Sequence, residues 1–543
     1  MPNIPHTRAQ HPVADTQRPA AHAQSPAARP TEVLVVGAGP VGLTLALGLA
    51  RAGVDCRIIE REPRFRDRGV RGKGINPRTL EVFDDLGVVD AILDRGTPDL
   101  RVRTYERDRL VLEIDPAPGN RATPDRPYAG MLLLGQHHTE EVLRDRLAGH
   151  GVTVETDTEL LDHAQDADGV VATVRRGDRT ERLTARYLVG CDGGRSTVRK
   201  RAGIAFLGEN WEEERFIMAS MEVDGLDTGA MHVWNDPRLG IGALLLVPMR
   251  ADANWAVHAS VAPDEHGEVP APTADTFREL FAERAALPGV TLHEPIWSTV
   301  WRPMVRMVER YRDGRVLLAG DAAHCQSAAG GQGMNTGIQD AHNLGWKLAA
   351  VLRGAPDALL DSYQAERLPV ARTVLAAASA QHRALFGADG ARALAEQITD
   401  LSAGPDFTGL AVGYRGGPLG RDLDDTTGIR AGDRAPDAPC TTADGTPTRL
   451  FDLFRGPHFT LLTVGGHPAL GEPAVPAVPP MPTMPTGLRR ADVLDPDGHI
   501  ARAYGLRGDA VVLVRPDGHV SLTGATADPG TLAGHLGAYA PAR

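Results

Sequence analysis

The chain has 543 residues, enough for three or four domains of the usual size of about 150 residues. Its 42% hydrophobic and 24% charged residues are typical of a globular protein and exclude the fibrous and wholly disordered classes. The net charge of −12 is spread along the chain without a basic block, so no nucleic acid partner is expected.

Neither the cysteines nor the N-terminal segment indicates a secreted protein. Cys56, Cys191, Cys325 and Cys440 lie far apart and show no metal-ligand spacing, so we expect no disulfide scaffold and no metal site. Residues 1–30 lack the apolar core of a signal peptide and are rich in Pro, Ala and polar residues, which predicts a disordered tail. No apolar run reaches the roughly 20 residues of a membrane span. We therefore expect a cytoplasmic protein without a membrane segment.

The ordered chain is expected to begin at Thr31 with a parallel strand–helix–strand unit. The segment TEVLVVGAGPVG predicts a buried strand that runs into a glycine turn, and LTLALGLARAG predicts a helix that ends at Gly53. A second strand is expected at residues 54–60. This order of elements predicts an α/β domain built on a parallel sheet.

The glycine turn has the full context of a dinucleotide-binding fingerprint. Its glycines at positions 37, 39 and 42 permit a tight turn and the close approach of a pyrophosphate to the backbone N–H groups at the helix start. Glu60 ends the second strand, where a carboxylate can accept the hydroxyls of a ribose. This motif alone leaves NAD and FAD as alternatives.

A second glycine-rich segment favours a flavin. Asp321 follows a hydrophobic strand, and the run GGQGMNTG at residues 330–337 opens a helix. The carboxylate is suited to accept ribityl hydroxyls, while the backbone N–H groups and the helix dipole suit the electron-rich pyrimidine edge of a flavin. A third segment, GCDGG with Asp192, lies between the other two.

The remaining elements indicate further units. β-forming runs between Phe216 and Val261 predict an antiparallel sheet of a second domain. Helices expected at residues 335–353 and 362–384 return the chain to the first domain. Beyond a Gly- and Pro-containing linker, the strand candidates FTLLTVG and AVVLVRP predict a small C-terminal α/β unit.

The segments VVGAGPVG, GCDGGRSTVR and GDAAHCQSAAGGQGMNTGIQDAHNLGWKL, in this order, resemble the single-component FAD-dependent aromatic hydroxylases. These are the group A, para-hydroxybenzoate hydroxylase-like flavoprotein monooxygenases, and the resemblance covers roughly residues 31–385. It implies an α/β fold with a Rossmann-like FAD-binding domain of the three-layer ββα/βα type. An antiparallel-sheet substrate domain is inserted into that domain.

The resemblance also implies the residues that bind FAD. The fingerprint and Glu60 would bind the ADP half, Asp192 would lie near the pyrophosphate and the path of NAD(P)H, and Asp321 would hold the ribityl chain. Asn335 and its neighbours would carry the isoalloxazine. The full set is Gly37, Gly39, Pro40, Val41, Gly42, Glu60, Arg61, Arg71, Gln136, Asp192, Asp321, Gly331, Gly333, Met334 and Asn335.

No side chain is identified as certainly catalytic, because in this family the cofactor carries the chemistry. Arg71 and the backbone carbonyl of Ala328 are the two candidates. Related enzymes commonly have a proline before the glycine run, where this chain has Ser327-Ala328-Ala329, so the fixed proline φ is lost there. His324 is expected to be structural rather than a base.

The C-terminal segment resembles the degenerate thioredoxin-like domain of hydroxylases that act on aromatic polyketides and phenols. GDRAPDAP opens it, LFDLFRGPHFTLLTV follows, and VVLVRPDGHV lies near its end. Where a thioredoxin carries paired cysteines, this chain has GGHP, which excludes disulfide exchange. The expected division of the chain is a tail at 1–30, FAD-binding parts at 31–207 and 308–403, a substrate domain at 208–307, a linker at 404–436 and the thioredoxin-like domain at 437–543.

The implied activity is NAD(P)H- and O2-dependent hydroxylation of a polycyclic, polyketide-type aromatic compound through a flavin C4a-hydroperoxide. A homodimer is possible. The alternatives are Baeyer–Villiger-type oxygen insertion or ring rearrangement on the same scaffold, and a flavin- or ligand-binding protein without turnover. Apolar side chains in the substrate sheet are suited to line a wide planar site. The candidates are Met218, Met231, Trp234, Leu246, Met249 and Trp297.

Overall fold

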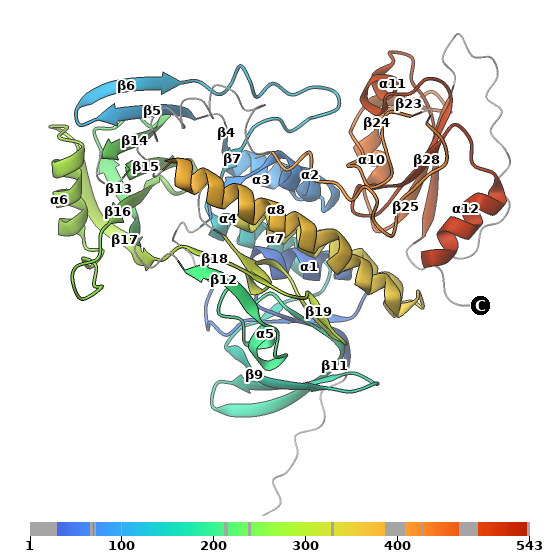
Figure 1. Cartoon of the computed structure of the whole chain (residues 1–543), viewed down its shortest axis with the longest axis horizontal. Helices are drawn as coiled ribbons and strands as arrows, with labels where there is room; N and C mark the ends of the chain where they lie inside the picture. Colours follow the sequence, from blue (N-terminus) through green and yellow to red (C-terminus); the bar gives the residue numbers. More distant parts are fainter. Residues whose placement is uncertain are drawn as a thin grey trace, which may run out of the picture.

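The computed structural model describes residues 30–65, 69, 72–98, 100–210, 215–236, 240–326, 331–385, 408–425, 427–465 and 487–539. The expected tail lies outside the described residues except for its last position, Pro30. Figure 1 shows an antiparallel sheet at one end, a central sheet with long helices, and a C-terminal α/β unit at the other end.

The central sheet carries the parallel core that the glycine motifs predict. Four parallel strands lie side by side in the order β20-β11-β1-β2. They are β1 (Thr31–Val36), β2 (Cys56–Ile59), β11 (Arg179–Gly190) and β20 (Val316–Leu318). Their runs of Val, Leu and Ile are almost fully buried, as in parallel sheets covered on both faces. The other strands of this sheet are β8 (Val154–Glu155), β9 (Thr158–Gln165), β10 (Val170–Arg176) and β19 (Arg312–Asp313).

Helices cover this sheet and carry the segments that follow its strands. α1 packs against both α4 and α7, and α8 lies beside α7 (Figure 1). The helices are α1 (Pro40–Arg51), α2 (Pro77–Asp85), α3 (Val89–Arg95), α4 (Gln136–Ala148), α5 (Thr197–Arg201), α7 (Gly333–Leu352) and α8 (Asp361–Leu385). The helices expected at residues 335–353 and 362–384 are therefore present as α7 and α8.

The second domain is built on a seven-stranded sheet in the order β17-β13-β16-β15-β14-β5-β6. Its strands are β5 (Arg101–Glu106), β6 (Arg109–Ile114), β13 (Arg215–Asp224), β14 (Ala230–Asp236), β15 (Gly240–Met249), β16 (Asn254–Val261) and β17 (Thr291–Trp301). The antiparallel arrangement of β13 to β16 agrees with the sequence. Strands β5 and β6 join this sheet through a parallel pairing with β14, although the sequence places them in the first domain.

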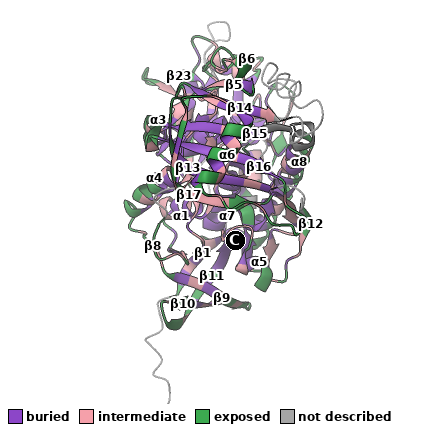
Figure 2. Ribbon diagram, turned by 90° about the vertical axis from the view of Figure 1, so that its left-hand side faces the viewer, coloured by how far each residue is buried: buried purple, intermediate pink, exposed green. Residues whose placement is uncertain are grey.

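One face of this sheet is closed by a helix. α6 (Ala274–Arg284) packs against it and shares with it a buried apolar cluster that includes Phe277 and Phe281. Figure 2 shows how much of β13, β15 and β16 is buried. The other face is therefore the one that can look toward the central sheet.

Two small sheets join the domains. One contains β3 (Gly74–Ile75), β4 (Thr97–Pro98) and β7 (Leu132–Leu133), and the other contains β12 (Phe206–Asn210), β18 (Met304–Val308) and β21 (His324–Cys325). The 3-10 turns are η1 (Arg250–Asp252), η2 (Gly320–Ala322) and η3 (Asp357–Leu360). No helix among the described residues is long and apolar enough to cross a membrane.

The C-terminal unit has its own seven-stranded mixed sheet, in the order β22-β28-β27-β25-β26-β23-β24. Its elements are β22 (Arg421–Asp422), β23 (Pro439–Thr442), β24 (Pro447–Arg449), α10 (Leu450–Phe454), β25 (Phe459–Gly465), β26 (Leu488–Leu494), α11 (His499–Tyr504), β27 (Ala510–Val514), β28 (Val520–Gly524), α12 (Pro529–Leu536) and η4 (Gly537–Tyr539). β22 belongs to the segment expected as linker, so part of that segment is bound into this sheet. Residues 466–468 of the GGHP segment lie outside the described residues.

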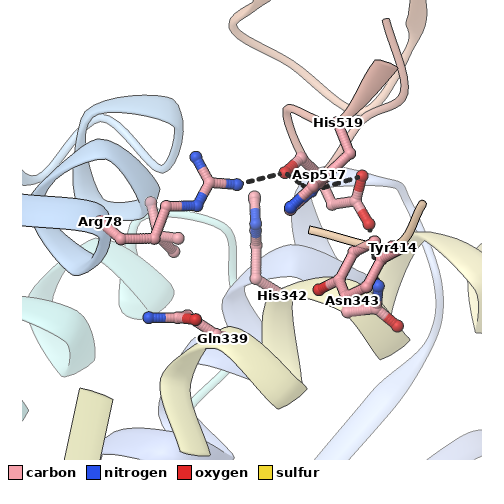
Figure 3. Close-up of a pocket in the computed structure, with 8 residues that line it drawn as sticks. Arg78, Gln339, His342, Asn343, Tyr414, Asp517 and His519 are labelled. Carbon is pink, nitrogen blue, oxygen red and sulfur yellow. Dashed lines mark hydrogen bonds and ion pairs between the residues drawn. The ribbon is translucent and has the colours of Figure 1, made fainter. Parts of the chain in front are cut away.

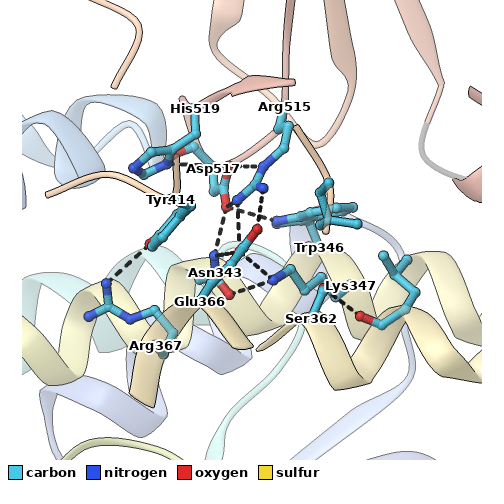
Figure 4. Close-up of polar contacts among 12 residues, drawn as sticks. Asn343, Trp346, Lys347, Ser362, Glu366, Arg367, Tyr414, Arg515, Asp517 and His519 are labelled. Carbon is cyan, nitrogen blue, oxygen red and sulfur yellow. Dashed lines mark hydrogen bonds and ion pairs between the residues drawn. The ribbon is translucent and has the colours of Figure 1, made fainter. Parts of the chain in front are cut away.

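A buried polar network fastens this unit to the central helices (Figure 4). Arg515 donates to both carboxylate oxygens of Glu366 on α8, at 2.6 and 3.1 Å. Asp517 accepts from Asn343 and Trp346 of α7, at 3.0 and 3.1 Å.

A small pocket at the same junction is lined by Arg78, Gln339, His342 and His519, among others (Figure 3). It lies between the C-terminal unit and the helices, so it is not the site that the glycine motifs indicate.

Candidate cofactor and substrate site

The three motifs of the sequence meet at one edge of the central sheet. Gly37 follows β1, Asp192 lies just after β11, and Gly320 follows β20, while Glu60 follows β2. Because these strands are parallel and adjacent, their carboxyl ends form a single edge. Ligands of open α/β sheets bind at this edge.

Close packing around the first motif explains two of its glycines. Gly37 has φ of +102°, and a Cβ built on it would lie 2.5 Å from the carbonyl oxygen of Cys191. A Cβ on Gly42 would lie 1.9 Å from the carbonyl oxygen of Gly37. These glycines bring β1, α1 and the end of β11 together, and any side chain at either position must displace backbone.

Val41 joins the first motif to the third in chain order, the segment of residues 320–337. A Cβ on Gly320 would lie 2.8 Å from Val41 Cγ2, and one on Gly337 would lie 2.7 Å from the same atom. Pro40 is the first residue of α1, where its fixed φ suits a helix start. The N-terminal ends of α1 and α7 are thereby held close to the same strand edge.

Other motif glycines face open space. A Cβ built on Gly39, Gly193, Gly331 or Gly333 would meet no atom within 4 Å. Gly39 is the N-cap of α1 and its φ of −74° is open to any residue, so neither the fold nor the backbone demands glycine there. A cradle left open at these positions fits a bound dinucleotide that approaches the backbone.

The acidic residue of the fingerprint lies across the turn. One oxygen of Glu60 accepts from the N–H of Ala38 at 3.0 Å, and the other accepts from the N–H of Glu62 at 3.1 Å. Its carboxylate is thus fixed beside the glycine turn with lone pairs left for ribose hydroxyls. Arg61 is exposed and lies 3.4 Å from a carboxylate oxygen of Glu62.

Asp192 and Asp321 differ in their surroundings. Oδ2 of Asp192 accepts from the N–H groups of Thr197 and Val198, at 2.7 and 3.1 Å, while its buried Oδ1 has no hydrogen-bond partner among the described residues. Burial raises the pKa of Asp192. The side chain of Asp321 is exposed at the strand edge. Asp192 therefore holds the start of α5, whereas Asp321 is accessible to a ligand.

This contrast predicts opposite effects for two substitutions. Asp321→Ala should weaken FAD binding by roughly 1.5–3 kcal/mol, because it removes a charged acceptor for ribityl hydroxyls, and should leave the melting temperature of the apoprotein unchanged. Asp192→Ala should instead lower apoprotein stability by about 1 kcal/mol through loss of its hydrogen bonds to the N–H groups of Thr197 and Val198, with the smaller effect on FAD. Apoprotein melting and FAD titration of both variants separate the two. Equal FAD affinity of Asp321→Ala and the unaltered chain would contradict the ribityl assignment.

The segment expected at the isoalloxazine is tied to β3 and to the residues on either side of it. Asn335 is fully buried, accepts from the N–H of Asn76 at 3.0 Å and donates to the carbonyl oxygen of Gly74 at 2.9 Å. A Cβ on Gly72 would lie 3.3 Å from Gln136 Oε1 and 3.4 Å from Met334 Sδ. Gln136 also donates to Glu140 at 2.7 Å. Gln136, Met334 and Asn335 are thus brought together around residues 72–74.

The two catalytic candidates, Arg71 and Ala328, lie outside the described residues, so their roles stay predictions.

His324 is fully buried, and its Nε2 lies 2.7 Å from Asp340 Oδ2. Asp340 also accepts from the N–H of Gly320 and from Arg367. A histidine enclosed in this way supports the structure of the third motif, as the sequence indicates.

The substrate-lining candidates divide between the two faces of the second sheet. Met218, Met231 and Met249 lie on the face away from α6, and the latter two pack with Leu133 of β7. Trp297 pairs with Ser220 of β13, and a Cβ on Gly69 would lie 3.0 Å from its ring. These four side chains remain candidates, because their face looks toward the cofactor domain.

Trp234 and Leu246 point the other way. Both are fully buried in the cluster against α6, where the ring of Trp234 lies 5.5 Å from that of Phe281. Strand residues alternate between faces, and the even-numbered positions of β14 and β15 face α6. We therefore correct the expectation for these two residues: they belong to the core of the second domain and do not line a substrate site.

Two polar clusters were not identified from the sequence. Lys73 Nζ lies 2.8 Å from His258 Nε2, between the loop before β3 and the second sheet. The Nε2 atoms of His137 and His138 lie 2.9 and 2.8 Å from one oxygen of Asp252, and this is the one group of possible metal ligands found among the described residues. It joins α4 to the turn between β15 and β16. Residues separated by more than a hundred positions carry no joint signal in one sequence.

The comparisons with known proteins agree with this site. The FAD binding domain family matches residues 30–378, and the aromatic-ring hydroxylase C-terminal family matches residues 429–539. A flavin-dependent monooxygenase of Mycobacteroides abscessus is 39% identical over 500 residues, covering 90% of this chain and 96% of that protein. A 6-methylpretetramide 4-monooxygenase of Streptomyces rimosus is 35% identical over 536 residues and covers 93% of each chain.

A solved structure shares the whole architecture. The ternary complex of aklavinone-11 hydroxylase with FAD and aklavinone superposes with a TM-score of 0.77 at 29% identity, covering 94% of this chain and 98% of that chain. The open glycine cradle, the exposed Asp321 and the buried Asn335 fit the FAD that this architecture binds. The chain belongs to the family of FAD-dependent aromatic-ring hydroxylases and is a flavin-dependent monooxygenase.

Proposed function

We propose that this enzyme hydroxylates a polycyclic phenol or quinone of the polyketide type, with NAD(P)H as reductant and O2 as oxidant. The observation that carries the proposal is the broad face of the second sheet that looks toward the cofactor domain. Met218 and Leu245 supply apolar side chains on β13 and β15, whereas Val247 and Met249 of the same face are buried in a cluster with Leu133 of β7. Relatives named for tetracycline-type and aklavinone substrates support the same class of ligand.

FAD supplies the redox chemistry and the activation of oxygen. The chain's own task is to bind the cofactor and to orient the substrate ring against it. Its apolar sheet also excludes water from the reacting atoms. The sequence holds one full dinucleotide fingerprint, so NAD(P)H has no Rossmann domain of its own and acts as a transient reductant.

The hydroxylases among the relatives favour hydroxylation over Baeyer–Villiger-type insertion and over a flavoprotein without turnover. We also propose the domain division expected from the sequence, with a thioredoxin-like character for the C-terminal unit. A cytoplasmic location and a homodimer complete the proposal. The four cysteines are free, and the mixed sheet around β25 supports the thioredoxin-like interpretation.

Stopped-flow flavin reduction tests the substrate class. Anthraquinone- or angucycline-sized phenols should accelerate reduction by NADPH and yield a product heavier by one oxygen atom, because bound substrate gates the access of the reductant. Single-ring phenols should have little effect on the rate. If only the single-ring phenols accelerate reduction and are oxygenated, the polycyclic assignment is wrong.

A further inference from the structure

Lys73 and His258 form an isolated polar pair at the boundary between the two domains. Their side-chain nitrogens are 2.8 Å apart and both residues are partly buried. Lys73 belongs to the loop before β3, and His258 lies in the middle of β16. The pair joins segments that are 185 positions apart.

The backbone of the Lys73 loop is held by the segments expected at the flavin. Gly72 accepts from the N–H of Gln136, and Gly74 accepts from the side chain of Asn335. Lys73 itself accepts from the N–H of Leu134 at 2.8 Å. The side chain of Lys73 therefore extends from this loop, and its ammonium group lies between the segment expected at the isoalloxazine and the second sheet.

His258 lies on the sheet face proposed to receive the substrate. Its register partners are Met218 of β13 and Leu245 of β15, so the surface around it is apolar. The next positions along this face include Ser220 and Ser260. Both serines are buried, and their Oγ atoms have no hydrogen-bond partner among the described residues.

The charge of Lys73 has no counter-ion in the part of the chain that the structure describes. Among the described residues its side chain has one hydrogen-bond partner, the imidazole of His258, and burial lowers the pKa of Lys73 to about 8. Burial and the nearby Lys73 also lower the pKa of His258 well below its usual value, so the imidazole is neutral. A partly buried cation beside a neutral acceptor favours a ligand that brings an anionic oxygen.

We propose that Lys73 and His258 form a binding site for an acidic hydroxyl, a phenol or enol, of the aromatic substrate, with Ser220 and Ser260 available to its other oxygens. This inference rests on the proposed function and adds the group that selects the ligand. The hydroxyl O–H bond breaks and its proton passes to solvent, which leaves a phenolate beside the Lys73 ammonium. The new negative charge offsets the positive charge of Lys73, and the ring is held in its electron-rich form.

Two planar probes that differ in one methyl group test the site on the FAD-loaded enzyme. The enzyme should bind 2-hydroxyanthraquinone at least about tenfold more tightly than 2-methoxyanthraquinone, and the bound hydroxy compound should show the red-shifted absorption of its anion. Lys73→Met should reduce this ratio to within about twofold and abolish the shift. Lys73→Arg should retain both, since the cation is kept.

Matched variants separate the site from the fold. Lys200→Met makes the same change at an exposed lysine of α5 and should bind both probes as the unaltered enzyme does. His258→Leu should weaken the preference for the hydroxy compound without changing FAD content, which provides a second test if Lys73→Met does not fold. An unchanged preference in both variants would overturn the site.

The anionic oxygen could instead come from the flavin, and the dissociation constant of FAD distinguishes this source. If Lys73→Met weakens FAD binding and leaves the preference between the two probes unchanged, the substrate assignment is overturned. If the unaltered enzyme binds neither probe and no polycyclic phenol accelerates flavin reduction, the proposed function fails together with this site. Accelerated reduction with no preference for the hydroxy compound overturns the site alone.

Discussion

Gly39→Ala is expected to weaken FAD binding while leaving the apoprotein folded. A Cβ at this position meets no protein atom within 4 Å and the backbone φ is −74°, so alanine costs the fold no more than about 1 kcal/mol as an N-cap. The open space is where the pyrophosphate must approach the N–H groups of the helix start. Overpacking there should cost about 1–3 kcal/mol of FAD binding, or roughly a tenfold to hundredfold rise in Kd.

Two other glycines of the same helix region provide controls. Gly42→Ala should destabilise the apoprotein itself, by about 3 kcal/mol, because its Cβ would lie 1.9 Å from the carbonyl oxygen of Gly37. Gly48→Ala, in the middle of α1 with no atom within 4 Å, should raise stability by about 0.5–1 kcal/mol and leave FAD affinity unchanged. Urea unfolding of the apoproteins and FAD titration measure both quantities. Full FAD affinity in Gly39→Ala would place the cofactor elsewhere.

The parts of the site that a sequence can predict are those whose signal is local. Gly37 and Glu60 lie in one strand–helix–strand unit, so their spacing already implies the turn and the strand end that the structure shows. Asp321 and Asn335 likewise lie close together in the sequence, between the end of β20 and the first turn of α7. The parallel order of the strands then brings these segments to one edge, as the fold class requires.

The features that the sequence did not predict depend on contacts between residues that lie far apart along the chain. Composition marked Trp234 and Leu246 as apolar, but which face of the sheet they occupy depends on α6 and on the register between β14 and β15. The pairing of β5 with β14 is equally non-local, so no pattern in the sequence indicates that residues 101–114 join the second sheet. A signal for Lys73 did exist: it is one of only three lysines in the chain and follows closely after Arg71, which the resemblance places among the FAD-binding residues.

The junction with the C-terminal unit is another feature that only the structure reveals, and it should control stability. Arg515, Glu366, Lys347 and Asp517 are all buried and together carry no net charge. Burial raises the pKa of Glu366, but the charges of Arg515 and Lys347 outweigh it and lower the pKa to about 2. Such a network is stable only while every charge keeps its partner.

Arg515→Met should therefore destabilise the enzyme by about 3–5 kcal/mol, since it leaves the Glu366 and Asp517 carboxylates buried without their main counter-ion. Arg415→Met, which removes an exposed partner of Asp433 in the same unit, should cost less than about 1 kcal/mol. Urea unfolding at pH 7 measures both, and a cost of Arg515→Met no larger than that of Arg415→Met would contradict the role of the network.

The same substitution should also speed the release of FAD, because α7 and α8 connect the junction to the third motif. Asn343 of α7 contacts both Glu366 and Asp517, and Arg367 of α8 donates to Asp340, which accepts from the N–H of Gly320.

The stability advantage of the unaltered enzyme over Arg515→Met should be complete above about pH 4.5, the usual carboxyl range, and shrink as the pH falls toward 2. That direction follows because protonation of Glu366 in the unfolded chain precedes its protonation in the folded one. If this difference in the free energy of unfolding grows as the pH falls, the buried carboxylates destabilise the network even in the presence of Arg515, and its proposed role is contradicted.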